Sequence, residues 1–220
     1  MTLPTSIKAV LWDMDGLLVD TEPLWTIAET EMCAALGATF TREAKAEMVG
    51  HRIDAAIPIL LKHLVAQGVS GASEELLTKQ LLERMVGLFD SDLVFLPGAL
   101  YLLSRLAEAG IPSVLVSSSY RVLVDAIIAR TPAGSFVASL GGDEVANAKP
   151  HPEPFVTAAR LAGVAPGECL ALEDSVAGMR SALAAGCAAI MIPSVPGVEP
   201  EAGWTALSSL TEVGDLLPRS

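Results

Sequence analysis

The chain has 220 residues, of which 51% are apolar, and its formal net charge at pH 7 is −12. This length suits one core domain with a smaller insertion, and the apolar share is ample for a packed core, which excludes a disordered chain. The acidic balance argues against nucleic acid and anionic membranes as partners, because no surplus of Lys and Arg can neutralise their phosphates. A small phosphorylated metabolite stays compatible, since a pocket can be locally positive in an acidic protein.

Three cysteines, Cys33, Cys169 and Cys187, are widely spaced and form no CxxC pattern. This argues against a zinc site and a disulfide framework, and it favours free thiols in a reducing compartment. No signal peptide is recognisable at the N-terminus, and the longest apolar run, 182–193, is too short to cross a bilayer. We expect a cytoplasmic protein, and we expect it to be a monomer.

The first predicted element is a buried strand over 7–12, a compact apolar run that ends at acidic residues. From about 20 to 93 no strand pattern occurs, and the apolar spacing predicts three or four amphipathic helices, at 23–36, 42–49, 52–67 and 73–89. A helical block inserted after the first strand predicts a core domain over 1–19 and 94–220 and a small all-helical cap over 20–93. Closure of such a cap would exclude water from a site below it.

Beyond the helical block, apolar runs alternate with helical patterns. The predicted strands are 113–116, 136–140, 169–172 and 188–192, and the predicted helices are 99–109, 121–130, 154–162 and 176–185. This alternation predicts an α/β fold, a Rossmann-like parallel sheet with helices on both faces. Sites in such sheets lie at the carboxyl ends of the strands.

The predicted strand ends carry polar side chains of the types that a site for phosphate and metal requires. In chain order they are Asp13, Asp15, Ser117, Ser118, Lys149, Glu173 and Asp174. Asp13 and Asp15 follow the first strand, where alternate residues of an extended chain point the same way. Each signal alone is weak, but their joint occurrence at strand ends predicts one site.

Phosphate monoesters are dianions, so an attacking carboxylate is repelled unless cations intervene. We expect Mg²⁺, which prefers oxygen ligands, held by Asp13, Asp15, Asp174 and Glu173, with the main-chain carbonyl of Asp15 as one ligand. Lys149 would neutralise the phosphate and Asp13 together. The Ser117 hydroxyl and nearby groups such as Ser118 would hold the transferring oxygens.

Asp13 is the candidate nucleophile, and its attack on phosphorus would give an aspartyl-phosphate. Asp15 is the candidate general acid and base, which protonates the leaving oxygen and then activates water. In the cap, Arg52 and Trp25 are candidate substrate contacts. The alternatives are a solvent-facing helix start for Arg52 and core packing for Trp25.

Residues 13–16 (DMDG), Ser117, Lys149 and residues 173–174 (ED) resemble, in order, the four motifs of the haloacid dehalogenase (HAD) superfamily. The segments 13–25 (DMDGLLVDTEPLW), 149–155 (KPHPEPF) and 173–178 (EDSVAG) are similar to its β-phosphoglucomutase-like subgroup, and within it to sugar-phosphate phosphatases of the 2-deoxyglucose-6-phosphate and hexitol phosphate type. The resemblance implies Asp13 as nucleophile, Asp15 as acid and base, and a helical cap.

Several reactions within this superfamily compete. Asp15 argues against carbon–halogen hydrolysis, because a halide leaves without a proton, and against a non-catalytic sugar-phosphate-binding module. A sugar phosphate mutase of the β-phosphoglucomutase type stays the alternative, although Trp25 stands where the resemblance implies a histidine in mutases. The sequence therefore predicts Mg²⁺-dependent hydrolysis of a small phosphorylated metabolite, a sugar or polyol phosphate.

Overall fold

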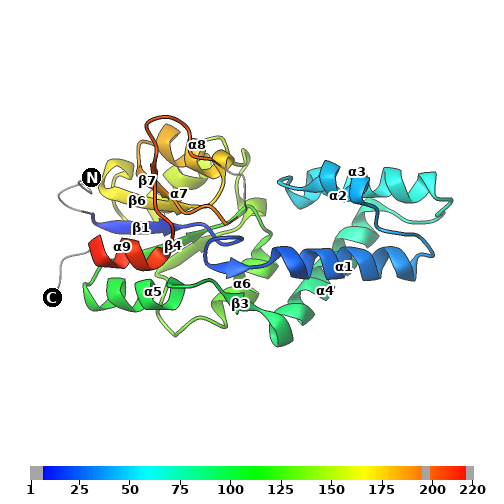
Figure 1. Ribbon diagram of the computed structural model, residues 1–220, viewed down its shortest axis with the longest axis horizontal. Helices are drawn as coiled ribbons and strands as arrows, with labels where there is room; N and C mark the ends of the chain where they lie inside the picture. Colours follow the sequence, from blue (N-terminus) through cyan, green and yellow to red (C-terminus); the bar gives the residue numbers. More distant parts are fainter. Residues whose placement is uncertain (1–6, 195–198, 217–220) are drawn as a thin grey trace. The chain divides into compact units, whose positions relative to one another are not determined.

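The computed structural model describes residues 7–194 and 199–216. The chain divides into two compact units, one from Met1–Asp20 with Val94–Ser220 and the other from Thr21–Leu93 (Figure 1). The first unit is an α/β domain and the second is helical.

A six-stranded parallel sheet forms the centre of the α/β unit. Its strands, in spatial order, are β5 (Ala138–Leu140), β4 (Ser113–Val116), β1 (Ala9–Trp12), β6 (Cys169–Glu173), β7 (Ala188–Met191) and β8 (Thr205–Ala206). All four residues of β1 are buried, and β1 pairs with both β4 and β6. An unbroken apolar run is typical of a parallel strand covered on both faces. The predicted α/β class and the five predicted strands are confirmed.

Helices cover both faces of this sheet. They are α5 (Ala99–Glu108), α6 (Arg121–Ile128), α7 (Glu153–Leu161), α8 (Val176–Ala184) and α9 (Leu210–Leu216), with short 3₁₀ turns at Gly142–Glu144 and Pro166–Glu168. The chain moves from β1 to β4 and β5 in one direction and from β5 to β6 and β7 in the other. Right-handed crossovers therefore put α5 and α6 on one face and α7 and α8 on the opposite face (Figure 1). Phe155 of α7 packs with Leu11 of β1 and Val116 of β4 in one buried apolar cluster.

Three short strands lie where the sequence predicts no strand, namely β8 at the edge of the sheet and two that form a separate two-stranded ribbon. β2 (Val19–Asp20) and β3 (Val94–Phe95) pair antiparallel, and the Leu96 amide donates to the carbonyl of Leu18 at 3.0 Å. Strands of two residues are too short to show the alternation by which a strand is predicted. The β2–β3 pair thus holds together the two chain segments that lead into and out of the helical unit.

The second unit consists of four helices, α1 (Glu22–Ala35), α2 (Arg42–Met48), α3 (Ile53–Ala66) and α4 (Glu74–Asp92). The side chains of Thr41 and Ser73 accept from the amides three residues on and so begin α2 and α4. The apolar faces of these helices are buried within the unit; Leu60 of α3 and Leu81 of α4 are examples. Among residues 7–194 and 199–216, no helix has both the length and the apolar surface that crossing a membrane requires.

One carboxylate in the helical unit, that of Glu29, lies in an environment that disfavours its ionised form. Glu29 of α1 is 8% exposed, and burial raises its pKa to about 7, although the ammonium group of Lys45 lowers it in part. Lys45 is itself shared, because it pairs with Glu22 at 2.6 Å and donates to Thr26. Folding therefore favours the protonated form of Glu29.

We predict that Glu29→Gln stabilises the protein at pH 8 but has little effect at pH 5. The pKa of Glu29 in the folded state, about 7, lies above its usual value of 4.5, so the folded state binds more protons than the unfolded state between these two pH values. Stability then falls as pH rises through this window, by about 3 kcal/mol at 1.4 kcal/mol per pKa unit. Urea unfolding at both pH values measures the difference. The exposed Glu83→Gln is the control, and an equal gain at pH 5 and pH 8 would contradict the prediction.

Candidate active site

The carboxyl ends of three adjacent strands bring the candidate residues together. Asp13 follows β1, Ser117 follows β4, and Glu173 is the last residue of β6. The Asp13 amide donates to the carbonyl of Leu172 at 3.0 Å, and the Ser117 amide donates to the carbonyl of Leu140 at 3.0 Å. Sheet pairing therefore fixes the backbone from which each of these buried side chains projects.

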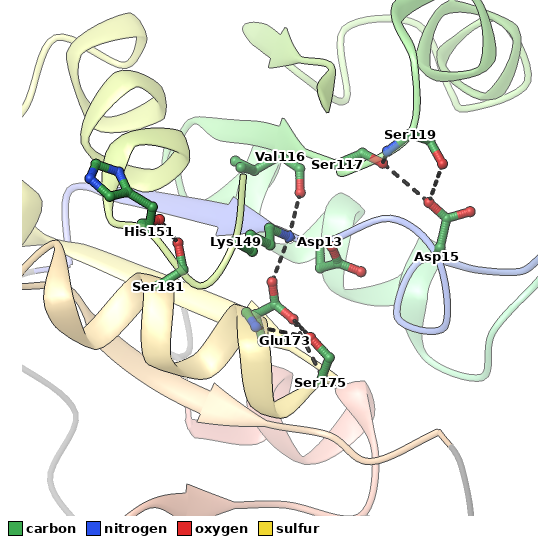
Figure 2. Close-up of polar contacts among 11 residues, drawn as sticks. Asp13, Asp15, Val116, Ser117, Ser119, Lys149, His151, Glu173, Ser175 and Ser181 are labelled. Atoms are coloured by element: carbon green, nitrogen blue, oxygen red, sulfur yellow. Dashed lines mark hydrogen bonds and ion pairs between the residues drawn. The ribbon is translucent and has the colours of Figure 1, made fainter. Parts of the chain in front are cut away.

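Lys149 lies in the loop before α7, and its ammonium group connects the strand ends. Nζ donates to Asp13 Oδ1 at 2.5 Å, to Glu173 Oε1 at 2.6 Å and to the carbonyl of Val116 at 3.0 Å (Figure 2). These three acceptors match the three protons of an ammonium group. The side chain is 6% exposed, and Nζ lies 5.2 Å from the centre of the Phe155 ring.

The loop that carries Lys149 is held from α8. The buried Ser181 hydroxyl donates to the carbonyl of His151 at 2.5 Å, and the Lys149–Pro150 peptide is cis (Figure 2). Glu173 is fixed on its other side, because Oε2 accepts from the Ser175 hydroxyl at 3.0 Å. Both partners of the ion pair are therefore oriented by neighbouring hydroxyl groups.

Burial and charge shift the pKa values of these groups. Burial alone would lower the pKa of Lys149, but the carboxylates of Asp13 and Glu173 outweigh it and raise the pKa above its usual value. Burial raises the pKa of Asp13 well above its usual value, and Glu173 adds to the shift while Lys149 opposes it. Burial and the Glu173 carboxylate raise the pKa of Asp174 to about 7. The site thus holds more negative charge than Lys149 can balance.

Three carboxylates form the acidic cluster, defined here as Asp13, Glu173 and Asp174, whose ligand atoms lie within 4.8 Å of one another. When all three are ionised, they exceed the charge of the single Lys149 ammonium group by two negative charges. A β-carbon at Gly16, where φ is +85°, would come 2.2 Å from Asp174 Oδ2, so glycine lets the loop after β1 approach that carboxylate. Among the described residues, this cluster fits a divalent cation with oxygen ligands such as Mg²⁺.

Asp15 is oriented differently from the acidic cluster. Its Oδ2 accepts from the hydroxyls of Ser117 and Ser119, at 3.1 and 2.9 Å (Figure 2). The structure does not place its carboxylate among the cluster's ligand atoms, and metal ligation by Asp15 through its main-chain carbonyl stays a prediction.

The sequence prediction missed Ser119. The alternation that predicts one direction for the side chains of Asp13 and Asp15 applies equally to residues 117 and 119, so the same pattern could have singled out Ser119. Ser118 is half-buried between them, and a β-carbon at Gly142 would come 2.1 Å from its carbonyl oxygen. Its role in substrate binding stays a prediction.

The two cap candidates belong to the helical unit. Arg52 precedes α3, and its guanidinium donates to Asp54 at 3.1 and 2.5 Å. Trp25 is half-buried on α1. Their contacts with substrate stay predictions.

Comparison with known proteins identifies the class to which this fold and site belong. The model of the haloacid dehalogenase-like hydrolases matches residues 7–186. The chain belongs to this family, and the resemblance predicted from its motifs is confirmed.

The relatives include hexitol phosphatase B of Escherichia coli (strain K12), which is 32% identical over 97% of each chain. Two similar structures are of CbbY from Rhodobacter sphaeroides, one in complex with phosphate and one with xylulose-(1,5)bisphosphate. Each is 31% identical, has a TM-score of 0.83 and matches 94% of this chain and 96% of the other.

We predict that Gly178→Ala destabilises the fold by about 3 kcal/mol, because it breaks a buried ion pair. A β-carbon at Gly178 of α8 would lie 1.9 to 2.0 Å from the carboxylate of Glu173, which is fully buried and cannot shift without leaving Lys149. Urea unfolding measures the loss. The control is Gly87→Ala on α4, where the nearest atom to an added β-carbon is 3.9 Å away. There alanine should raise the free energy of unfolding by about 0.5–1 kcal/mol. Equal effects of the two substitutions would contradict the prediction.

Proposed function

We propose that the protein hydrolyses a sugar or polyol phosphate, with Asp13 as nucleophile, Asp15 as general acid and base, and Mg²⁺ as the cofactor. The chain is a phosphoric monoester hydrolase, the class of its named phosphatase relative. The observation that carries the rest is the position of Asp13, which lies at the end of the central strand with Lys149 on one oxygen and two further carboxylates beside it.

The carboxylates around Asp13 repel a phosphate dianion unless a bound cation offsets their negative charge. A divalent cation held by Asp13, Glu173 and Asp174 would supply the positive charge that offsets the dianion during attack. Lys149 screens the nucleophile, and the Ser117 hydroxyl lies beside the same strand end. A carboxylate and a dianion can then approach each other at this site.

The reaction proceeds in two steps. Asp13 attacks phosphorus and the bond from phosphorus to the ester oxygen breaks, so the phosphoryl group is carried by Asp13. Asp15 gives its proton to the departing alkoxide, which leaves as an alcohol. A water molecule then attacks the aspartyl-phosphate, Asp15 takes up the proton of that water, and inorganic phosphate is released with Asp13 restored.

The substrate class rests on the relatives. Hexitol phosphatase B is named for phosphorylated sugar alcohols, and CbbY has been seen with a ketose bisphosphate. These names support a small phosphorylated metabolite with several hydroxyl groups. The three cysteines are buried as free thiols, which suits the reducing cytoplasm in which we propose that the protein acts as a monomer.

We predict that Asp13→Asn lowers phosphate release from a panel of sugar and polyol phosphates by at least on the order of a thousandfold, because the nucleophile is lost. The control is Asp125→Asn, an exposed carboxylate on α6, which should keep wild-type rates. Equal rates for wild type and Asp13→Asn would show that the nucleophile is wrong. Conversion of a sugar 1-phosphate to the 6-phosphate, primed by a bisphosphate, would favour the mutase instead.

We predict that Mg²⁺ binds to the wild-type chain with measurable heat in calorimetry, without any substrate. Asp174→Asn removes one carboxylate charge from the acidic cluster and should weaken this binding at least about tenfold, since even groups that only support ligands contribute that much. Asp125→Asn should leave it unchanged. Equal affinity in wild type and Asp174→Asn would exclude the acidic cluster as the cation site.

A further inference from the structure

The loop after β4 presents two buried hydroxyls to the carboxylate of Asp15. Ser117 and Ser119 both donate to its Oδ2, at 3.1 and 2.9 Å, and the Ser119 amide donates to the Ser117 hydroxyl at 2.9 Å (Figure 2). Both serines are buried, with 4% and 8% of their surface exposed. One oxygen of Asp15 is therefore held by two donors from a single loop.

The two hydroxyls differ in what the proposed reaction requires of them. A hydroxyl has one proton to donate. If Ser117 donates to a transferring phosphate oxygen, it no longer donates to Asp15. Ser119 makes the shorter of the two bonds and has no part in phosphate binding under the proposed function. Of these two bonds, the one from Ser119 is retained when phosphate binds.

The backbone at Ser119 is fixed by a hydrogen bond and close packing with the turn at Gly142. Its carbonyl accepts from the Gly142 amide at 2.7 Å, and Gly142 packs so closely on Ser118 that a β-carbon would come 2.1 Å from the Ser118 carbonyl oxygen. The loop after β4 is thereby fixed against the turn after β5. A hydroxyl on such a loop can fix the orientation of a carboxylate.

We propose that Ser119 is a positioning residue, which holds Oδ2 of Asp15 so that the other carboxylate oxygen gives its proton to the departing alkoxide oxygen. This inference rests on the proposed function, in which Asp15 is the general acid. Asp15 lies one hydrogen bond from Ser117, the hydroxyl assigned to the phosphate, so its carboxylate is held next to the bond that breaks.

The leaving group decides how much the reaction depends on this proton. An alkyl phosphate expels a strongly basic alkoxide, which must be protonated as the bond breaks. 4-Nitrophenyl phosphate expels a weakly basic phenolate, which leaves without help. The parameter kcat/KM covers the steps up to the first irreversible one, so it reports departure of the alcohol rather than later hydrolysis of the aspartyl-phosphate.

The experiment measures kcat/KM for the best alkyl phosphate of the panel and for 4-nitrophenyl phosphate. We expect Ser119→Ala to lower the ratio of alkyl to aryl kcat/KM at least about tenfold, which is part of the roughly hundredfold to ten-thousandfold that general acid catalysis contributes. Ser119→Thr keeps the hydroxyl and should retain the ratio. The matched control is Ser113→Ala, which removes another buried hydroxyl of the same segment, one that accepts from Trp12 at 3.1 Å, and should leave the ratio unchanged.

A second comparison separates positioning of Asp15 from a general loss of structure. In an Asp15→Asn background, Ser119→Ala should change the ratio no further, because the group that it positions is gone. An equal fall on both substrates, or no fall on either, overturns the role of Ser119. A different result would overturn the proposed function itself: equal release of phosphate by wild type and Asp13→Asn from both substrates.

Discussion

The buried ammonium group of Lys149 is the interaction on which the site depends. An ammonium group without partners in the interior would lose its charge or destabilise the fold, and this one is 6% exposed. Its three acceptors come from Asp13 after β1, Val116 at the end of β4 and Glu173 at the end of β6. The stability of the lysine therefore requires the convergence of the same three strand ends that the chemistry uses.

Lys149 balances only part of the charge that converges there. The acidic cluster holds three carboxylates, and burial raises the pKa of Asp13 and of Asp174 above their usual values. A cation that binds the folded state and not the unfolded state would stabilise the fold by mass action. The close approaches at Gly16 and Gly178 preserve this arrangement, since any β-carbon there would meet Asp174 or Glu173. Glycine at position 178 leaves room for Glu173, and glycine at position 16 both permits the positive φ of the turn and leaves room for Asp174.

The sequence predicts this site well where one rule of sheet geometry applies. Parallel strands with unbroken apolar runs must be buried on both faces, so the residues after them converge at one edge, and Asp13, Lys149 and Glu173 follow from that rule together with the motif resemblance. The direction of a side chain at a strand end does not follow from it. The carboxylate of Asp15 accepts from the serines after β4 rather than joining the acidic cluster, and β2 and β3 are too short to show a period.

The hydroxyl of Ser117 links phosphate binding to the acid. Its single proton goes to Asp15 in this structure, and the phosphate oxygens would compete for it. Under the proposed function, binding of phosphate removes one donor from Asp15 at the point in the cycle when that carboxylate protonates the leaving group. A carboxylate with fewer donors is a better proton acceptor and can also turn more easily. In the proposed mechanism Ser119 limits this freedom, because its bond to Oδ2 of Asp15 is retained while the bond from Ser117 is given up to the phosphate.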